Sequence, residues 1–356
     1  MKKLTYILYD GIKNSVFISL ILKPLLKRLD NDNNLEIMLV TFEKTKLSNK
    51  TLMNLIPAHD RLHLVICRKF PFWGKSSLWL AKYQLKKLLK LYPTTNIITR
   101  GSLAGWIAFK SVKKNIKNIN LTVQARGLSA EEYRFYSQKK DISFIKKIIK
   151  KFIYKRLKTI EKQIYSKKNI IIEAVSPALK TYIHQNFKAD NSRIEIENLE
   201  NLIKNITDKE KEFWKNKIRK KLNISGNKTI YCYSGSYKAW QGLPEIINFF
   251  KEKYNQDKNI FLLILSSDKK IIQKMLFEST LPDNSYLVLN IRPENLYKYL
   301  SACNVGLLFR EEDIINWVSR PTKMLEYQAA GLEIMHNNTI DLLANQNKTS
   351  IVHRIQ

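Results

Sequence analysis

Residues 304–331, NVGLLFREEDIINWVSRPTKMLEYQAAG, carry the strongest signal in this 356-residue chain. The apolar run 305–309 predicts a buried strand, a charged loop follows it, and a helix is expected to open at 319–321. Pro321 suits the first helical position, and Gly331 suits the end of the helix. A strand that leads through a loop into a helix N-terminus forms an anion site, because unpaired N–H groups and the helix dipole point at one spot.

Two charged side chains strengthen this predicted anion site. Lys323 can add a positive charge near the helix N-terminus, and Glu326 lies three residues later on the same face. A cation, a helix terminus and a carboxylate together can hold a diphosphate and a sugar hydroxyl. An ordinary strand–helix unit with a well-capped helix would carry the same residues, so this segment alone leaves both interpretations open.

The rest of the chain alternates strands and helices in two series. In the first series we expect strands at 5–9, 36–42, 62–67, 96–99, 120–124 and 170–175, and helices at 16–29, 77–91, 103–113 and 142–166. In the second we expect strands at 229–233, 260–265, 286–290, 305–309 and 332–336, and helices at 208–221, 243–254, 269–277, 294–301 and 321–330. The alternation predicts an α/β protein of two doubly wound, Rossmann-like domains, 1–203 and 204–356, that face each other across a cleft.

Cysteine and histidine usage argues against a disulfide framework and against a metal site. The three cysteines, Cys67, Cys232 and Cys303, are widely spaced, and the five histidines show no ligand spacing. No run of about 18 apolar residues exists in the sequence, and the N-terminus has too short an apolar run for a signal peptide. We therefore expect a soluble, cytoplasmic protein without membrane spans.

The net charge of +31 is concentrated in the first half of the chain. Residues 1–200 hold 39 Lys and Arg against 15 Asp and Glu, whereas residues 201–356 hold 23 against 16. Such an excess implies an anionic partner, which could be a lipid surface, a phosphorylated acceptor or nucleic acid. The sequence has no recognition motif for nucleic acid, so we expect no nucleic-acid partner and favour the first two.

The predicted helix 142–166 combines an apolar stripe with strong positive charge. Its apolar residues follow helical spacing, and residues 139–168 contain 12 basic side chains against Asp141 and Glu161. A basic amphipathic helix can lie on an anionic membrane. A helix packed on the sheet of its own domain, with solvated lysines, has the same pattern, and we favour packing for the stripe because most surface helices are amphipathic.

A resemblance to a known family rests on the opening segment. Its residues form the pattern Ser-x-Pro-x-Lys-x-x-Glu-Tyr, from Ser319 to Tyr327, followed by Ala330 and Gly331. This block resembles that of GT-B glycosyltransferases of the family 4 type, which use nucleotide sugars and retain the configuration of the sugar. The resemblance implies that Glu326 binds the nucleotide ribose. It also implies contacts to the diphosphate or sugar from Lys323 and from its neighbours Ser319, Arg320 and Thr322.

A second segment resembles the glycine-containing loop that opens the donor domain of this family. In residues 229–247, TIYCYSGSYKAWQGLPEII, Gly235 and Gly242 fit the pattern. Ser236 and Gln241 stand where the family usually carries a basic residue and a lysine. The diphosphate would then be neutralised by Lys238, Arg310 or Lys323. Val318 stands where many members carry a glutamate, eight positions before the ribose-binding one.

The first domain resembles the family more loosely. Gly11, Asn14 and Ser15 follow the first strand, in the position of the family's acceptor-facing loop, and Arg100 stands in a similar turn after the fourth. Arg126 lies in a segment that resembles the family's Arg-Gly motif. The resemblance implies that Gly11, Asn14, Ser15 and Arg100 face the acceptor, and that Lys323, Lys238 and Arg126 take part in catalysis.

The resemblance implies retaining transfer of a sugar from a nucleotide-diphosphate sugar to a glycan or lipid-linked acceptor, with no metal and no other cofactor. The expected setting is bacterial surface polysaccharide synthesis (O-antigen, capsule or lipopolysaccharide), on an anionic membrane at the inner face of the plasma membrane. The main alternative is a catalytically weakened GT-B scaffold that assists other glycosyltransferases. A sugar-nucleotide 2-epimerase shares the architecture but would need carboxylate-rich segments that the sequence lacks.

Overall fold

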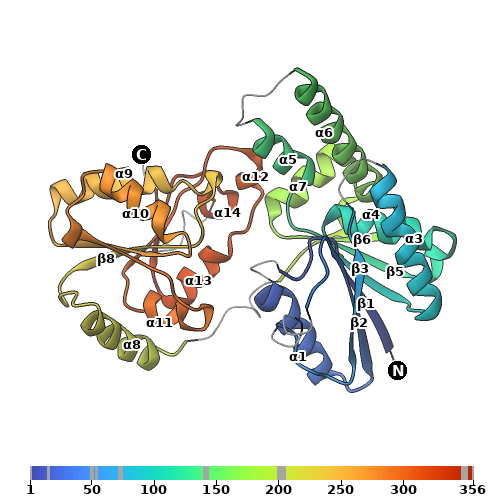
Figure 1. Cartoon of the computed structure of the whole chain (residues 1–356), viewed down its shortest axis with the longest axis horizontal. Coiled ribbons are helices and arrows are strands. Elements are labelled where there is room, and N and C mark those ends of the chain that lie inside the picture. Colours follow the sequence, from blue (N-terminus) through green and yellow to red (C-terminus); the bar gives the residue numbers. More distant parts are fainter. Residues whose placement is uncertain are drawn as a thin grey trace. The chain divides into compact units, whose positions relative to one another are not determined.

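The computed structural model describes residues 2–13, 17–48, 52, 55–70, 75–138, 144–198, 206–345 and 352–354. The chain forms two compact units, Met1–Leu202 and Ile203–Gln356, and each unit has its own sheet (Figure 1). Two of the predicted acceptor residues, Asn14 and Ser15, lie outside the described residues.

Within its described residues, the first unit contains seven parallel strands in the order β3-β2-β1-β4-β5-β6-β7. The order grows outward from β1 in both directions, as in a doubly wound sheet. All six strands predicted for this series are present. The strands are β1 (Lys2–Leu8), β2 (Leu35–Glu43), β3 (Leu62–Arg68), β4 (Asn96–Arg100), β5 (Asn120–Ala125), β6 (Ile170–Ala174) and β7 (Ile194–Ile196).

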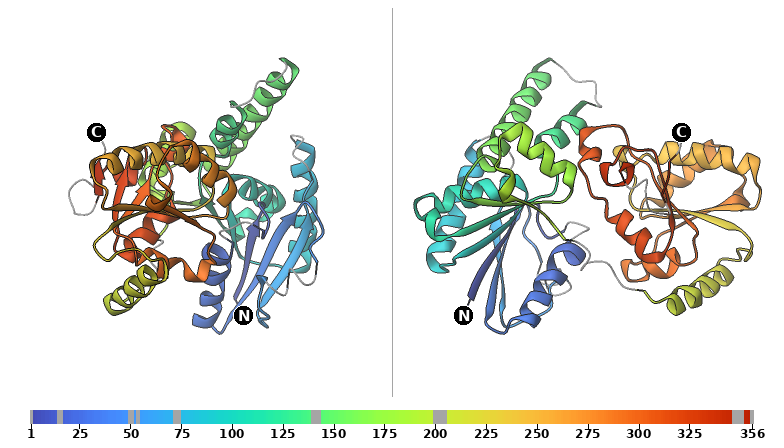
Figure 2. Two further views of the ribbon diagram at one scale, coloured as in Figure 1. Left: turned by 60° about the vertical axis from the view of Figure 1, so that its left-hand side comes forward. Right: turned by 180° about the vertical axis from the view of Figure 1, so that it is seen from behind.

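Helices cover the sheet of the first unit (Figures 1 and 2). On one face, Leu4, Tyr6 and Leu8 of β1 pack in a cluster with Leu25 and Leu29. Because side chains alternate along a strand, these residues give β1 an apolar face toward the helix that contains Leu25 and Leu29. The helices are η1 (Ile18–Leu22), α1 (Lys23–Asn31), α3 (Lys75–Leu91), α4 (Gly101–Val112), η2 (Lys113–Asn118), α5 (Ser129–Gln138), α6 (Phe144–Tyr165), α7 (Pro177–Phe187) and η3 (Asn191–Arg193).

In this unit, α5, α7, β7 and the short helices η2 and η3 have no counterpart among the predicted elements. A local signal for α7 was present, because the side chain of Ser176 accepts a hydrogen bond from the backbone N–H of Leu179 at 3.0 Å and Pro177 opens the helix. Strand β7 has only three residues, and pairing with β6 rather than local propensity gives it its conformation.

Within its described residues, the second unit contains six parallel strands in the order β10-β9-β8-β11-β12-β13. They are β8 (Thr229–Ser234), β9 (Ile260–Leu265), β10 (Tyr286–Leu289), β11 (Val305–Leu308), β12 (Glu333–His336) and β13 (Val352–Arg354). The five predicted strands are present, and β13 is an addition. The helices are α8 (Asp208–Lys221), η5 (Ala239–Gln241), α9 (Leu243–Gln256), α10 (Lys269–Glu278), η6 (Asp283–Ser285), η7 (Pro293–Asn295), α11 (Leu296–Leu300), α12 (Ile314–Trp317), α13 (Thr322–Ala330) and α14 (Asp341–Ala344).

Both faces of the second sheet are buried. Every residue of β9 is buried, which is typical of a parallel strand covered on two sides. Residues of α9 and α10 pack on one face, among them Phe250 and Leu276. Residues of α11, α13 and α14 pack on the other, among them Leu300, Met324 and Leu343.

The segment that opened the sequence analysis folds largely as predicted. Strand β11 is followed by a short helix, α12, in what the sequence indicates as a loop, and then by α13. Pro321 precedes α13 as its N-cap with φ −65° and ψ 131°, so its predicted place as the first helical residue is wrong by one position. Gly331 ends α13 at φ +75°, a left-handed conformation that favours glycine. A Cβ on Gly306 would lie 2.4 Å from Tyr327 Cδ2, so this glycine lets α13 approach β11 closely.

Candidate functional site

The candidate site of the second unit gathers at the carboxyl ends of neighbouring strands. Gly235 directly follows β8, Arg310 lies two residues beyond β11, and Asn337 directly follows β12. These three strands are adjacent in the sheet, and α13 begins shortly after β11. Loops that leave neighbouring parallel strands at the same edge bring residues distant in sequence together.

Lys323 is the centre of this cluster. It lies in the first turn of α13 and is buried, and its Nζ donates a hydrogen bond to Gln241 Oε1 at 2.5 Å. The same Nζ lies 3.8 Å from the centroid of the Tyr233 ring. Burial lowers the pKa of Lys323 well below its usual value of 10.5, and the charge of Arg310 lowers it further, while Glu326 opposes both effects.

Glycine is required at the point where the β8 loop passes Lys323. Gly235 has φ +131°, and a Cβ there would lie 2.6 Å from Lys323 Cε and 2.8 Å from its Nζ. Gly242 closes the same loop at φ +57°, and a Cβ there would lie 3.0 Å from the backbone of Phe309. The two glycines therefore permit the close packing of this loop against α13 and β11.

Tyr233 holds the loop after β8 through its hydroxyl group. The sequence did not identify it as a site residue. Its hydroxyl lies 2.6 Å from Gln241 Oε1 and 2.9 Å from the carbonyl oxygen of Ser236. Gln241 therefore accepts contacts from both Tyr233 and Lys323 through one oxygen. Burial raises the pKa of Tyr233, so this hydroxyl stays protonated at neutral pH.

Arg310 supplies a second cation at the same edge. The backbone N–H of Arg310 donates to Asn337 Oδ1 at 3.2 Å, and Asn337 Nδ2 donates to the Arg310 carbonyl oxygen at 2.7 Å. Burial lowers the pKa of Arg310. Among the described residues neither Arg310 nor Lys323 forms an ion pair, so two cations lie here without a carboxylate in contact.

Glu326 provides a carboxylate one turn along α13. Burial raises its pKa, and the charge of Lys323 partly opposes that shift. Its side chain is half-buried, and it makes no hydrogen bond to another described residue. A carboxylate held in this way can accept hydrogen bonds from a ligand.

The other predicted residues of this unit lie around the cluster in different environments. Lys238 is exposed, and its Nζ lies 5.1 Å from the centroid of the Trp240 ring. Ser319 donates its hydroxyl to the carbonyl oxygen of Asn316 at 2.8 Å. Val318 is fully buried, so its side chain belongs to the core rather than to an open site. Thr322 opens α13, and Arg320 is half-buried just before it.

In the first unit, the predicted loop after β1 is fixed by a residue that the sequence analysis missed, Glu43. Its Oε1 accepts hydrogen bonds from the backbone N–H of Ile12 at 2.8 Å and from the Thr41 hydroxyl at 2.6 Å. Gly11 has φ +77°, and a Cβ there would lie 2.6 Å from Glu43 Oε2. The glycine therefore allows the carboxylate of β2 to hold this loop.

The predicted arginines of the first unit belong to a polar row across the sheet. Arg126 forms a two-pronged ion pair with Glu197, with Nη2 2.5 Å from Oε1, and Nη2 also donates to Gln124 Oε1 at 3.0 Å. Burial lowers the pKa of Arg100, and Arg126 lowers it further. Arg126, Gln124 and Glu197 line a cavity of about 560 Å³, together with Glu173 and Glu195. Sequence reasoning missed Glu197, which lies 71 residues from its partner.

No protein-family model and no curated protein matches the sequence. The structure is similar to a sucrose-phosphate synthase from Thermosynechococcus elongatus, with a TM-score of 0.69 and 14% identity over 100% of this chain and 86% of that chain. WaaG, a glycosyltransferase involved in lipopolysaccharide biosynthesis, gives 0.63 and 11% over 99% and 87%. Anabaena HepE in complex with UDP and glucose gives 0.62 and 12% over 99% and 86%. The chain has the GT-B fold.

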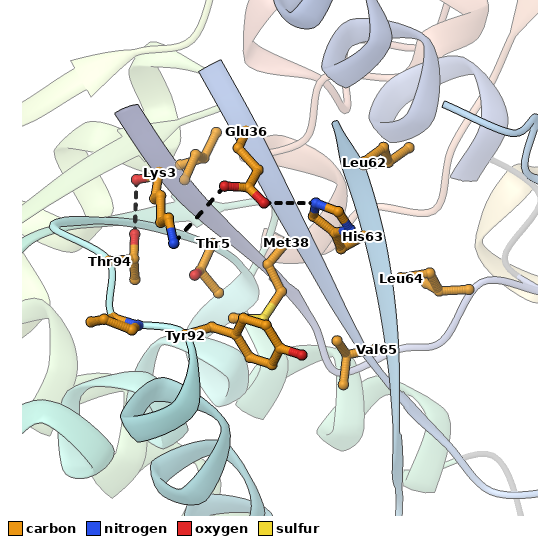
Figure 3. A pocket seen from close by; sticks show the side chains of 12 residues that line it. Lys3, Thr5, Glu36, Met38, Leu62, His63, Leu64, Val65, Tyr92 and Thr94 are labelled. Atoms are coloured by element: carbon orange, nitrogen blue, oxygen red, sulfur yellow. Dashed lines mark hydrogen bonds and ion pairs between the residues drawn. The ribbon is translucent and has the colours of Figure 1, made fainter. Parts of the chain in front are cut away.

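The GT-B fold indicates which cavity is unsuited to bind a ligand. One cavity of about 550 Å³ lies in the first unit at the amino-terminal ends of β1, β2 and β3 (Figure 3). Its polar contacts join His63 Nε2 to Glu36 Oε1 at 2.7 Å and Lys3 Nζ to Glu36 Oε2 at 4.0 Å. Ligands of open parallel sheets bind beyond the carboxyl ends of the strands. We therefore assign no functional role to this cavity.

No group of three or more His, Cys, Asp or Glu side chains that could hold a metal ion occurs among the described residues. In the same part of the chain, no helix combines the length and the apolar character needed to cross a bilayer.

Proposed function

We propose that this chain is a glycosyltransferase that moves a sugar from a nucleotide-diphosphate sugar to a glycan or lipid-linked acceptor. The observation that carries this proposal is the pair Lys323 and Arg310, two cations at the carboxyl ends of β8 and β11 without an ion-pair partner among the described residues. Burying positive charge without compensation disfavours folding, so a site built in this way is best explained by an anionic ligand. A nucleoside diphosphate supplies that charge.

Groups close to the two cations can each bind one part of the nucleotide-sugar donor. The N-terminus of α13 presents unpaired N–H groups to the diphosphate. Glu326 is suited to accept hydrogen bonds from the ribose hydroxyls, and Gly235 leaves room for close approach. We assign the remaining donor contacts to Ser236, Gln241, Ser319, Arg320 and Thr322.

We propose that transfer retains the configuration of the sugar and needs no metal. The bond from the anomeric carbon to the diphosphate breaks while the bond to the acceptor oxygen forms on the same face, and a diphosphate oxygen takes the proton of the acceptor hydroxyl. Negative charge grows on the leaving diphosphate, so fixed cations lower the barrier. Lys323 has this task in the first place, assisted by Lys238. We also assign Arg126 a part in catalysis.

The acceptor and setting are assigned on chemical grounds. A UDP-sugar is the first donor to test, because the similar HepE was solved with UDP and glucose. We place the acceptor beside Gly11, Asn14, Ser15 and Arg100, and propose a cytoplasmic, peripheral enzyme of bacterial surface polysaccharide synthesis at the inner face of the plasma membrane. The similarity to WaaG and the basic first half of the chain support this setting.

A second candidate is a GT-B scaffold that binds a nucleotide sugar but has lost most of its turnover. Two observations favour it. Gln241 stands in the place of an expected lysine, and its Oε1 accepts a hydrogen bond from the Lys323 ammonium at 2.5 Å. Val318 is fully buried where a carboxylate would be expected near the donor sugar. Both features weaken the charge arrangement around the reacting carbon while leaving the nucleotide part of the site intact.

One experiment tests the proposal and separates it from the scaffold. Binding of UDP, GDP and ADP to the full chain is measured by calorimetry, and hydrolysis of the corresponding nucleotide sugars is followed over hours. We expect one nucleotide to bind and its sugar to be hydrolysed, with binding weakened in Lys323→Ala. The matched control is Lys274→Ala, an exposed lysine of α10. Binding without any hydrolysis or transfer would favour the scaffold, and the absence of all nucleotide binding would contradict both candidates.

A further inference from the structure

The amino-terminal half of α6 exposes an apolar stripe. Ile145, Ile148, Ile149 and Phe152 are 70%, 55%, 52% and 62% exposed, respectively. Their spacing of three and four residues places them on one face of the helix. Figure 2 shows this end of α6 projecting beyond the other elements of the first unit. Large aliphatic and aromatic side chains gathered on one exposed face are typical of a docking surface rather than of ordinary protein surface.

The carboxyl-terminal half of the same helix is packed into the unit. Leu157, Ile160 and Ile164 are buried. At about 100° per residue, the centre of this buried stripe lies roughly a third of a turn away from the centre of the exposed one. The single packed stripe that the sequence analysis favoured is therefore wrong for the first half of α6. That half displays its apolar face to solvent.

Hydrogen bonds fix α6 in place, so the exposed face is held by the fold. Lys150 Nζ donates to the carbonyl oxygen of Ser137 at 2.6 Å. The Tyr154 hydroxyl donates to Glu131 Oε1 at 2.8 Å, and both acceptors belong to α5. An anchored helix of this kind presents its apolar face without first having to become ordered.

The charge around the exposed stripe is uniformly positive. Residues 144–158 contain seven basic side chains and no acidic one. Among the described residues Lys146, Lys147, Lys151 and Lys155 form no ion pair, and helical spacing places Lys146 on one side of the stripe and Lys151 and Lys155 on the other. An apolar stripe set among lysines complements a surface that is negative outside and apolar beneath, which is the surface of a bilayer with anionic lipids.

We propose that the amino-terminal half of α6 docks this protein on anionic lipid bilayers, with its axis in the plane of the membrane and Ile145, Ile148, Ile149 and Phe152 inserted among the lipids. The helix is 22 residues long, but its lysines recur along the whole exposed half, so it lies in the interface and does not cross it. The proposal deepens the proposed function, on which it rests, by identifying the surface from which a lipid-linked acceptor is reached.

Vesicle sedimentation tests this proposal on the full chain. Vesicles of phosphatidylcholine alone and with 30% phosphatidylglycerol are compared at low and high salt. We expect binding to the anionic vesicles at low salt, with weaker binding at high salt and on neutral vesicles. The double variant Ile148→Glu, Phe152→Glu should bind at least about tenfold more weakly. Its matched control is Phe277→Glu on α10, where the native side chain is 78% exposed.

Further variants measure what the lysines contribute to vesicle binding and test whether another helix carries the binding instead of the apolar stripe. The pair Lys147→Gln, Lys151→Gln should weaken anionic binding and reduce its salt dependence. Helix α3 also exposes Trp79 and Tyr83. If Trp79→Glu, Tyr83→Glu abolishes vesicle binding while the α6 variant retains it, the docking surface is α3 and the proposal is overturned. Equal binding to neutral and anionic vesicles, or capture only by soluble acidic protein, would also overturn it.

The same samples distinguish a failure of docking from a failure of the proposed function. UDP, GDP and ADP binding is measured by calorimetry without vesicles for the wild type and for the α6 variant. Unchanged nucleotide binding together with no difference in vesicle binding would overturn the docking proposal alone. A wild-type chain that docks on anionic vesicles but binds no nucleotide would leave the docking in place and contradict the proposed function.

Discussion

Replacing Lys323 with Met separates two effects of the buried cation, a cost to folding and a contribution to anion binding. Methionine has a similar length and no charge. In the wild-type chain the hydrogen-bond acceptor of Lys323 Nζ among the described residues is the neutral Gln241 Oε1, at 2.5 Å. A buried ammonium that contacts only a neutral amide and the Tyr233 ring, with the Glu326 carboxylate beyond ion-pair distance, destabilises the free protein.

The structure indicates that little is lost when this ammonium is removed. The Tyr233 hydroxyl lies 2.6 Å from the same Gln241 oxygen, so the acceptor keeps a partner in Lys323→Met. Replacing buried ionic groups with apolar residues of similar volume commonly stabilises a protein by about 1–4 kcal/mol, and we expect a gain in this range for the second unit at pH 7. Loss of the cation should at the same time remove most of the stabilisation that UDP gives the wild type.

The gain should depend on pH in a defined direction. Burial lowers the pKa of Lys323 well below 10.5 in the folded state, whereas the unfolded chain keeps its proton up to about that value. The cost of the lysine is therefore fully present below its folded pKa and declines as the pH rises toward 10.5. Lys323→Met should accordingly stabilise the chain more at pH 7 than at pH 10.

The reciprocal variant Gln241→Leu keeps the charge and removes its acceptor. We expect it to lower the free energy of unfolding by about 2–3 kcal/mol, because the ammonium is then buried without a hydrogen bond. The double variant Gln241→Leu, Lys323→Met should recover most of that loss. Opposite signs for the two single variants are the signature of an uncompensated buried cation.

Amide hydrogen exchange of β8 and β11 in the full chain reports the stability of the second unit alone, and thermal denaturation at pH 7 and pH 10 gives the pH dependence. UDP is added to each variant to measure the ligand-induced shift. A Lys323→Met chain that is less stable than the wild type at pH 7, or that binds UDP with unchanged affinity, would refute this reasoning.

Three further predictions concern single side chains. Burial raises the pKa of Glu161 from 4.5 to about 8, so the folded state keeps a proton that the unfolded chain releases, and the free energy of unfolding should fall by up to about 5 kcal/mol as the pH rises from 4.5 to 8. Glu161→Gln should remove this fall, as measured by urea denaturation at pH 5.5 and 8; an unchanged slope would contradict it. Gly235→Ala should destabilise the second unit by about 1–3 kcal/mol in thermal denaturation, because its φ of +131° is strained for alanine and the new Cβ would lie 2.6 Å from Lys323 Cε. Glu326→Gln should weaken binding of the preferred ribonucleoside diphosphate about tenfold but leave binding of its 2′,3′-dideoxy analogue unchanged in calorimetry; equal losses for both ligands would exclude a contact to the ribose.

Local sequence patterns were sufficient for most of the fold. The strands appear as short β-branched runs, and the start and end of α13 are signalled by Pro321 and Gly331, since period and capping depend on near neighbours. Two elements that the sequence did not predict, β7 and α12, have weak local signals. Strand β7 has three residues, and α12 has four residues inside a charged stretch. Their conformation depends on pairing and packing with distant parts of the chain.

The sequence by itself determined the doubly wound α/β class and the excess of positive charge, and it indicated Lys323 and Glu326 as candidate site residues. Only the tertiary structure decided what surrounds them. Lys323 meets Gln241 across 82 residues because β8 and β11 are neighbours in the sheet, and Arg126 meets Glu197 across 71 residues because of the order of β5, β6 and β7. It also decided which half of α6 is buried, because burial depends on the shape of the whole unit, whereas a periodic pattern shows only that a helix has an apolar face.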